Sequence, residues 1–359
     1  MKVAFYAPMK EPGHALPSGD RQMARQLMRA LELAGHEVQL ASRFSSFEAT
    51  GDPARQAAVR EAGLAEAEAL IRGMRGGERP DLWFTYHPYY KAPDWIGVEV
   101  AAALDIPYVT AEASYAGKRD NGPFAMAQAQ VRRGLALARV NFCFTPADRE
   151  GIARVARPGS LVDLPPFIDT DLLGEVEVIP APEAPARLLA VGMMRSRDKL
   201  DSYRILAKAL YLIQHMNFTL RIVGDGPERQ VVEALFQFLG PRVRLTGQLP
   251  PEQMAAAYAE ADLYLWPGCG EAYGLAYLEA QAMGLPVVAQ HIRGVPSVVQ
   301  DGVTGVLTAA EDVESYAAAI ATLIEDGARR RAMGQAARHF VRAGRCLPVA
   351  AEIIRGALA

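Results

Sequence analysis

Two glutamates in the second half of the chain have a spacing that suits a ligand rich in oxygen atoms. Glu271 and Glu279 lie within the stretch Gly268–Val288, GCGEAYGLAYLEAQAMGLPVV. The sequence predicts a strand before this stretch, a glycine-containing turn, and a helix that begins near Gly274. Free backbone amides at such a helix start, together with the helix dipole, favour a phosphate. The two carboxylates would then bind different hydroxyl-bearing parts of one ligand, as a sugar nucleotide requires.

Other interpretations of these and similar residues stay open or are disfavoured. The two glutamates also fit a solvated loop residue and a helix-surface residue. The turn VGDGP at Val223–Pro227 resembles part of a dinucleotide fingerprint, but it has no third glycine and no acidic residue about 20 positions on. This disfavours a nicotinamide-dependent dehydrogenase. Asp169 and Asp171 lie in a proline-rich segment, and we expect neither a metal site nor a cofactor.

Alternating strands and helices would position the glutamates. Near the start, Val3–Ala7 is predicted as a buried strand, Arg21–Ala34 as a helix ending at Gly35, and Glu37–Ser42 as a second strand, which is the βαβ pattern of a parallel sheet. Further strands are predicted at 81–87, 106–112, 140–146, 187–192, 218–226, 243–247, 262–268 and 286–290. Helices are predicted in the second half at 202–214, near 254–259, at 275–283, and after 328 with a break near Pro348.

Length and composition set wider limits. A chain of 359 residues is expected to form two domains, and the prolines between about 155 and 186 indicate a linker. With 38 basic and 41 acidic residues the net charge is −3, which disfavours a nucleic-acid partner. The longest stretch without charge, Ala280–Ile292, has 13 residues, too few to span a bilayer. Three cysteines without a CxxC pair indicate reduced thiols and a cytoplasmic protein.

Several further motifs stand before and after the glutamate stretch, in a characteristic order along the chain. RGVPSVV (Arg293–Val299) and DGVTGVL (Asp301–Leu307) come after it, and VGMMRSRDKL and LRIVGDGPER come before it. This series resembles the retaining nucleotide-sugar glycosyltransferases of the GT-B fold, in the large family with the Glu-x7-Glu signature (glycosyltransferase family 4, glycosyl transferases group 1).

The resemblance implies a fold and a domain division. It implies an α/β protein with two doubly wound, Rossmann-like domains that face each other across a cleft. Residues 1–175 would bind the acceptor and residues 176–340 the donor, with a C-terminal helix at about 340–359 packing back on the first domain. The activity would be metal-independent transfer of a sugar from a nucleoside diphosphate sugar to an acceptor hydroxyl. The alternative is a nucleotide-sugar-binding protein of the same fold that turns over weakly or not at all.

The resemblance also implies roles for individual residues on the donor side. Glu271 would contact donor-sugar hydroxyls, and Lys199 with Arg195 would neutralise the diphosphate. The family arginine usually follows Gly192 directly, where this chain has Met193. Arg197 is a second candidate, and a solvated polar loop is the alternative for all three cations. The predicted donor-binding residues are Gly19, Gly192, Gly224, Ala272, Tyr273, Gly274, Leu275 and Glu279, of which Glu279 would bind the ribose.

The acceptor side departs from the family pattern. Glu112 occupies the place where relatives commonly have a histidine, so it would bind a sugar hydroxyl or a cationic group instead. His87 ends the predicted strand at 81–87, and the carboxyl end of a strand faces the cleft in such folds. A packed rim histidine is the alternative for His87. Gly19 keeps one of two usual glycines, and a plain helix-entry turn capped by Ser18 or Asp20 is its alternative.

A stripe of arginines gives a last expectation. Arg21, Arg25 and Arg29 repeat every four residues on the first helix. A solvated helix face is one interpretation, and contact with anionic lipid headgroups at the inner face of the cell membrane is the other. The second would fit a lipid-linked or sugar acceptor in glycolipid or surface polysaccharide biosynthesis.

Overall fold

The computed structural model describes residues 1–16, 18–174 and 185–359. Contacts divide the chain into two compact units. The first comprises Met1–Pro165 and Leu347–Ala359, and the second comprises Pro166–Cys346. Each unit is built around a parallel sheet of six strands with helices packed on it.

The first unit has the strand order β2-β1-β3-β4-β5-β6. Its strands are β1 (Lys2–Tyr6), β2 (Glu37–Leu40), β3 (Leu82–Tyr86), β4 (Tyr108–Ala111), β5 (Val140–Cys143) and β6 (Leu161–Asp163). Its helices are α1 (Gly19–Leu33), α2 (Pro53–Gly76), α3 (Gly97–Leu104), η1 (Gly117–Arg119), α4 (Ala125–Leu137), α5 (Pro146–Ala153) and α12 (Leu347–Leu358). The strands β1, β3, β4 and β5 are almost entirely buried, as expected for a sheet covered on both faces.

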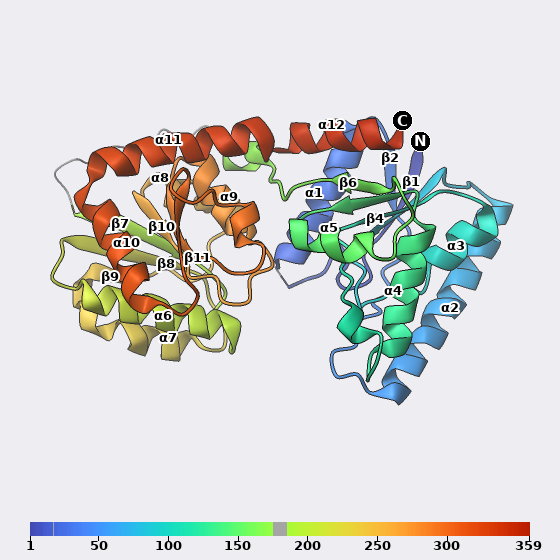
Figure 1. The fold of residues 1–359 in the computed structure, drawn as a ribbon, viewed down its shortest axis with the longest axis horizontal. Helices are drawn as coiled ribbons and strands as arrows, with labels where there is room; N and C mark the ends of the chain where they lie inside the picture. Colours follow the sequence, from blue (N-terminus) through green and yellow to red (C-terminus); the bar gives the residue numbers. More distant parts are fainter. Residues whose placement is uncertain (17, 175–184) are drawn as a thin grey trace. The chain divides into compact units, whose positions relative to one another are not determined.

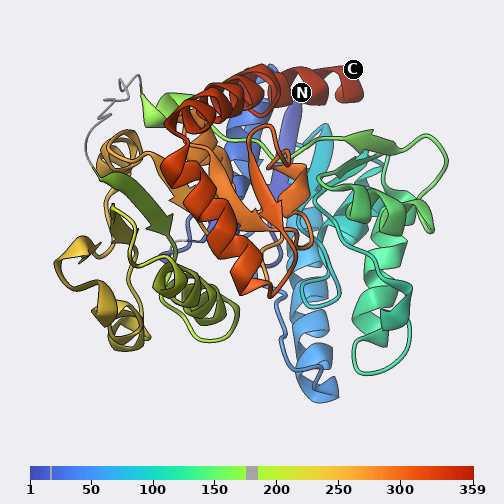
Figure 2. The same ribbon diagram turned by 60° about the vertical axis from the view of Figure 1, so that its left-hand side comes forward.

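The second unit has the strand order β12-β11-β10-β7-β8-β9. Its strands are β7 (Ala186–Val191), β8 (Phe218–Val223), β9 (Val243–Leu245), β10 (Leu263–Leu265), β11 (Val287–Gln290) and β12 (Gly305–Thr308). Its helices are η2 (Thr170–Leu173), α6 (Asp198–Leu212), α7 (Arg229–Phe236), η3 (Gln237–Arg242), α8 (Pro251–Ala259), α9 (Leu275–Ala282), η4 (Val295–Ser297), α10 (Val313–Glu325) and α11 (Gly327–Gly344). The helix α10 packs along β11 and β12 (Figure 2), and α11 packs on α9.

Each sheet has a point where the strand order reverses. In the first unit the chain leaves β1 for β2 on one side and then builds β3 to β6 on the other, so the reversal lies between β1 and β3. In the second unit it lies between β7 and β10. Loops that follow the two strands at a reversal leave in opposite directions and open a crevice for ligands.

The last helix belongs to the first unit. α12 lies against α1 (Figure 1), and Arg355 donates hydrogen bonds to the carbonyls of Leu33 and Ala34 at the end of α1. The break between α11 and α12 falls at 345–346, and Pro348 stands in the first turn of α12, where a missing N–H costs nothing.

The proline-rich linker was predicted too long. Residues 161–163 form β6, which pairs in parallel with β5, and residues 170–173 form η2. Residues 175–184 of the predicted linker lie outside the described residues. The short strand β6 is only half-buried at the sheet edge, so it lacks the apolar run by which the inner strands are recognised.

Candidate functional site

A lysine and a glutamate meet at the reversal point of the second sheet. Lys199 stands in the first turn of α6, after β7, and Glu271 in the loop after β10. The ammonium of Lys199 donates to Oε1 of Glu271 as an ion pair, and both side chains are more than two-thirds buried. The structure thus joins two residues predicted for the donor site, although the sequence placed Lys199 in a loop.

The tryptophan at the end of β10 contacts both members of this pair. Nε1 of Trp266 donates to Oε1 of Glu271 at 3.0 Å, and Nζ of Lys199 lies 5.5 Å from the ring centroid. Trp266 is 2% exposed. The sequence predicted only that Trp266 lies near the end of an apolar strand, and it did not predict the contact with Glu271.

The helix α9 begins without a side-chain cap. Its N-cap residue is Gly274, at φ 85°, a left-handed conformation that favours glycine. A Cβ there would lie 2.7 Å from the Tyr277 ring. The first N–H groups of a helix have no partner within it, so this end suits an anion. Leu275 and Tyr273 are buried, whereas Ala272 is exposed.

Glu279 lies on the same helix, on its fifth residue, where the sequence placed it. The hydroxyl of Tyr258 on α8 donates to Oε2 of Glu279 at 2.8 Å. Burial, followed by the charge of Glu279, raises the pKa of Tyr258 well above 10, so its hydroxyl remains a donor at neutral pH. This hydrogen bond fixes the orientation of the Glu279 carboxylate, which stands on the second turn of α9.

The predicted glycines 192 and 224 lie against each other. A Cβ on Gly224 would stand 1.9 Å from the carbonyl oxygen of Gly192, so the loops after β7 and β8 approach too closely for any side chain there. Arg195 is exposed, and no ion pair ties it to Glu271 among the described residues. Arg197 is the exposed N-cap of α6, at φ 62°. The structure therefore brings Lys199, and neither arginine, to the glutamate.

A second charged group lies at the reversal point of the first sheet. Asp20 stands in the first turn of α1, His87 directly follows β3, and Glu112 directly follows β4. Nδ1 of His87 lies 3.3 Å from Oδ1 of Asp20 and 3.9 Å from Oε1 of Glu112. The structure thus brings together the two residues predicted for the acceptor side and adds Asp20, which the sequence suggested only as a helix cap.

The backbone and the charges of this group are both unusual. His87 (φ 58°) and Glu112 (φ 53°) have left-handed conformations, which cost a non-glycine residue roughly 1 kcal/mol or more. Burial of His87 disfavours its protonation, but the charge of Glu112 and the hydrogen bond and charge of Asp20 outweigh burial and raise its pKa to about 9. At neutral pH His87 is therefore an imidazolium held by two carboxylates.

Two arginines of the stripe on α1 donate hydrogen bonds to the loop that precedes the helix. Arg21 donates to the carbonyl of His14 at 2.8 Å, and Nε of Arg25 donates to the carbonyl of Pro12 at 2.7 Å. Ser18 caps α1 by accepting from the amide of Arg21. A Cβ on Gly19 would meet open space, so packing of the described residues does not require glycine there. Arg25 and Arg29 remain exposed.

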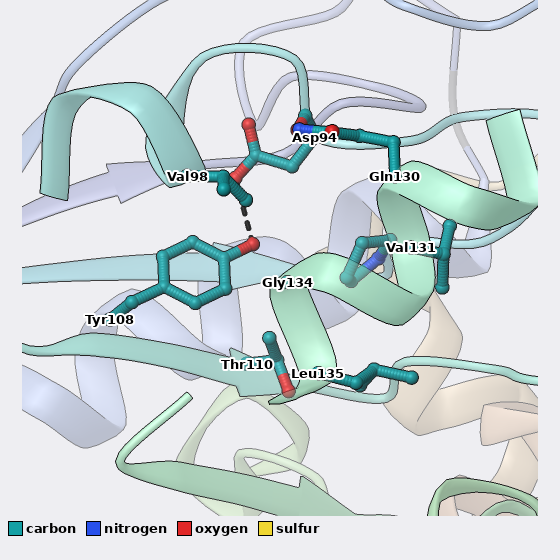
Figure 3. A pocket seen from close by; sticks show the side chains of 9 residues that line it. Asp94, Val98, Tyr108, Thr110, Gln130, Val131, Gly134 and Leu135 are labelled. Carbon is teal, nitrogen blue, oxygen red and sulfur yellow. Dashed lines mark hydrogen bonds between the residues drawn. The ribbon is translucent and has the colours of Figure 1, made fainter. Parts of the chain in front are cut away.

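A buried carboxylate of the first unit was also missed. Asp94 accepts from the hydroxyl of Thr85 and from the amides of Ile96 and Gly97, at 2.5 to 2.9 Å. It also accepts from the hydroxyl of Tyr108 at 2.9 Å (Figure 3). Burial raises its pKa, and the pocket around it has no room for a water molecule. Asp94 therefore joins β3, β4 and the start of α3, and a ligand has no space beside it.

The described residues contain neither a metal-binding cluster nor a membrane-spanning helix. No group of three or more His, Cys, Asp or Glu residues in them could hold a metal ion. Asp169 instead accepts from the backbone amide of Asp171. None of the helices in the described ranges is long and apolar enough to cross a bilayer.

Comparisons with known proteins point to sugar transferases. Residues 185–326 match the profile of a family described as Glycosyl transferases group 1. A GDP-mannose-dependent alpha-(1-6)-phosphatidylinositol monomannoside mannosyltransferase of Mycolicibacterium smegmatis is 33% identical over 204 residues, which are 50% of this chain and 51% of that protein. The chain thus spans about half the length of this curated relative.

Solved structures match over nearly the whole chain. Sucrose-phosphate synthase from Thermosynechococcus elongatus gives a TM-score of 0.76 at 22% identity, covering 99% of this chain and 98% of that one. Anabaena HepE in complex with UDP-glucose gives 0.67 at 16% identity, covering 100% and 99%. The chain therefore has the two-domain α/β GT-B fold, and its second unit carries a region similar to the glycosyl transferases of group 1.

Proposed function

We propose that this chain is a retaining, metal-independent glycosyltransferase of the Glu-x7-Glu family. It moves a sugar from a nucleoside diphosphate sugar to an acceptor hydroxyl. The observation that carries the proposal is the pairing of Lys199 with Glu271 beside the uncapped start of α9, which bears Glu279. One cation, one anion-binding helix end and two carboxylates then lie at the sheet reversal where α/β folds bind ligands. The relative that uses GDP-mannose and the neighbour solved with UDP-glucose support a donor of this class.

Different residues of the second unit bind different parts of the donor. Lys199 neutralises the diphosphate, assisted by Arg195 from the exposed loop. The amides of residues 272–275 hold the distal phosphate. Glu271 binds hydroxyls of the sugar, and Glu279 binds the ribose. Positioned cations favour reaction because negative charge builds on the diphosphate as it leaves.

The transfer step conserves atoms and charge without a cofactor. The acceptor oxygen forms a bond to the anomeric carbon on the face from which the diphosphate departs, and the bond from that carbon to the phosphate oxygen breaks. The acceptor proton passes to the leaving diphosphate, so the products are the glycoside and the nucleoside diphosphate. Glu271 positions the sugar and forms no covalent bond to it.

The first unit receives the acceptor in this proposal. Glu112 and His87 directly follow two neighbouring strands, and the carboxylates around His87 suit a hydroxyl or a cationic group of a sugar or lipid-linked acceptor. The exposed Arg25 and Arg29 would hold the protein at an anionic membrane surface on the cytoplasmic side. Glycolipid or surface polysaccharide synthesis is the proposed setting.

The test combines donor binding with one substitution. A thermal-shift panel of UDP-, GDP- and ADP-sugars identifies the donor, because a bound ligand stabilises the folded state. Glu271→Ala should then abolish transfer to sugar or lipid acceptors while unfolding stays nearly unchanged. Glu325→Ala, at an exposed site on α10, is the matched control.

Each outcome has a meaning. Full activity of Glu271→Ala overturns the site assignment. Tight donor binding with no product from any acceptor favours the non-catalytic nucleotide-sugar-binding protein. NMR of the product anomer tests retention, and activity in EDTA tests metal independence.

A further inference from the structure

The indole of Trp266 holds both charged residues of the proposed donor site at once. Its Nε1–H donates to Oε1 of Glu271, and its ring face lies under the ammonium of Lys199. Lys199 donates to the same oxygen, Oε1. Among the described residues, no hydrogen bond is made to the other oxygen, Oε2 of Glu271.

The indole itself is fixed on several sides. The Tyr203 ring meets it edge-on at 5.0 Å and 79°, and the hydroxyl of Tyr203 donates to the carbonyl of Gly192 at 2.7 Å. Gly192 lies against the indole, since a Cβ there would stand 2.6 Å from the ring. The carbonyl of Trp266 accepts from the hydroxyl of Tyr277 at 3.0 Å. The contacts of Tyr203 and Gly192 hold the ring in the orientation that points its N–H at Glu271.

The two bonds to Oε1 differ in what a diphosphate would do to them. The ammonium of Lys199 is a mobile point charge on a long side chain, and a diphosphate competes for it directly. The indole N–H is a donor only and has no other acceptor nearby in the contacts described. When Lys199 turns to phosphate, the indole N–H still orients the Glu271 carboxylate.

We infer that Trp266 is a positioning residue for Glu271: it keeps the carboxylate aimed at the sugar while Lys199 moves its charge to the diphosphate. This inference rests on the proposed function. It assigns Trp266 no contact with the donor. If the inference holds, the hydrogen bond from Trp266 to Glu271 strengthens binding of the sugar part of the donor and has little effect on binding of the free nucleoside diphosphate.

Trp266→Phe tests the inference because phenylalanine keeps an aromatic face for Lys199 and removes the N–H. Calorimetry with GDP-mannose and UDP-glucose, and with GDP and UDP, measures both parts of the ligand. We expect the sugar nucleotide that binds the wild type to bind the variant about tenfold more weakly, as for loss of a hydrogen bond to a charged group. The matching free nucleotide should bind within a factor of two of wild type.

A double-substitution cycle separates positioning from packing. In the Glu271→Ala background, Trp266→Phe should change sugar-nucleotide affinity by less than a factor of two, because the carboxylate it orients is gone. Tyr316→Phe is the control: it removes a hydrogen bond from a buried tyrosine to the carbonyl of Val288, outside this cluster. It should leave both affinities unchanged.

The results that overturn the inference differ from those that overturn the function. Equal weakening of sugar nucleotide and free nucleotide, or a full tenfold effect in the Glu271→Ala background, shows that Trp266 only supports packing. If no sugar nucleotide of the thermal-shift panel binds the wild type, the proposed function itself fails. Normal sugar transfer by Glu271→Ala overturns the site assignment instead. Circular dichroism on every variant checks that it is folded.

Discussion

The carboxyl edges of the two sheets carry charge pairs at corresponding places but surround them differently. At the reversal of the first sheet His87 pairs with Asp20, and at that of the second Lys199 pairs with Glu271. The histidine faces a second carboxylate, Glu112, and stands on strained backbone. Lys199 faces one carboxylate, Glu271, and the aromatic ring of Trp266.

This difference indicates that the two sheet edges bind ligands of different charge. The cation of the second unit has one carboxylate partner among the described residues, so an anionic ligand competes for it on favourable terms. The cation of the first unit is enclosed by two carboxylates, which leave an excess of negative charge. A diphosphate is therefore expected at the second edge, and a hydroxyl or a cation at the first.

Among the substitutions proposed, Lys199→Ala should have the largest effect, and it tests whether the second edge binds the diphosphate. Loss of the cation at the second edge should lower kcat/KM for the donor by a factor on the order of 10²–10³, as for loss of one electrostatic stabiliser of a leaving group. Steady-state kinetics measures it. Lys208→Ala removes an exposed lysine from the same helix and should have little effect. Similar kinetics for the two variants would remove Lys199 from the site.

Asp94→Ala tests whether a buried carboxylate of the first unit serves the fold alone. It leaves four donors without their acceptor, so the free energy of unfolding should fall by about 3 kcal/mol. Denaturant unfolding measures this fall. Asp163→Ala removes a mostly exposed acid on β6 that pairs with Arg149, and it should cost less than about 1 kcal/mol. Equal costs would contradict the structural role of Asp94.

The sequence predicted most of the fold because most strands are apolar runs between turn signals. The inner strands β1, β3, β5 and β8 and the helix α9 lie where periodicity placed them. β6 was lost among prolines. β12 was not predicted because it is only four residues long and partly exposed. α10 was not predicted either, although Tyr316, Ile320 and Leu323 follow the cap Asp312 at helical spacing.

The site was predictable only in part. Glu271, Glu279 and Lys199 were legible from motif order and residue type. Their partners were not, because Trp266 and Tyr258 look like core residues in sequence and reach the glutamates only through the packing of β10 and α8. Asp20 was likewise visible only as a cap, since its pairing with His87 depends on which strands are neighbours.

The pH dependence of stability sharpens the account of the first edge. The pKa of His87 is about 9 in the folded chain and near 6.5 when unfolded. A raised folded pKa stabilises fully below pH 6.5, and this stabilisation is lost as the pH rises through about 9. We expect a loss of about 2 kcal/mol over this window after allowance for solvent screening.

Denaturant unfolding of the Trp266→Phe variant measures this loss, since Trp83 and Trp95 then report the first unit alone. His87→Gln in the same background should flatten the curve between pH 6.5 and 9. An unchanged slope after that substitution would mean that His87 is not the titrating group.

The smallest effect concerns the arginines of α1, which belong to the same unit as the acidic edge. Their hydrogen bonds to loop carbonyls leave the guanidinium charges intact, and each exposed arginine near an anionic bilayer contributes about 1 kcal/mol. Reversing Arg25 and Arg29 to glutamate should therefore weaken binding to phosphatidylserine vesicles at least about thirtyfold in a flotation assay. Reversing Arg72 and Arg75 on α2 makes the same change in net charge. Equal loss in both variants would show that total charge, and not the α1 face, governs the contact.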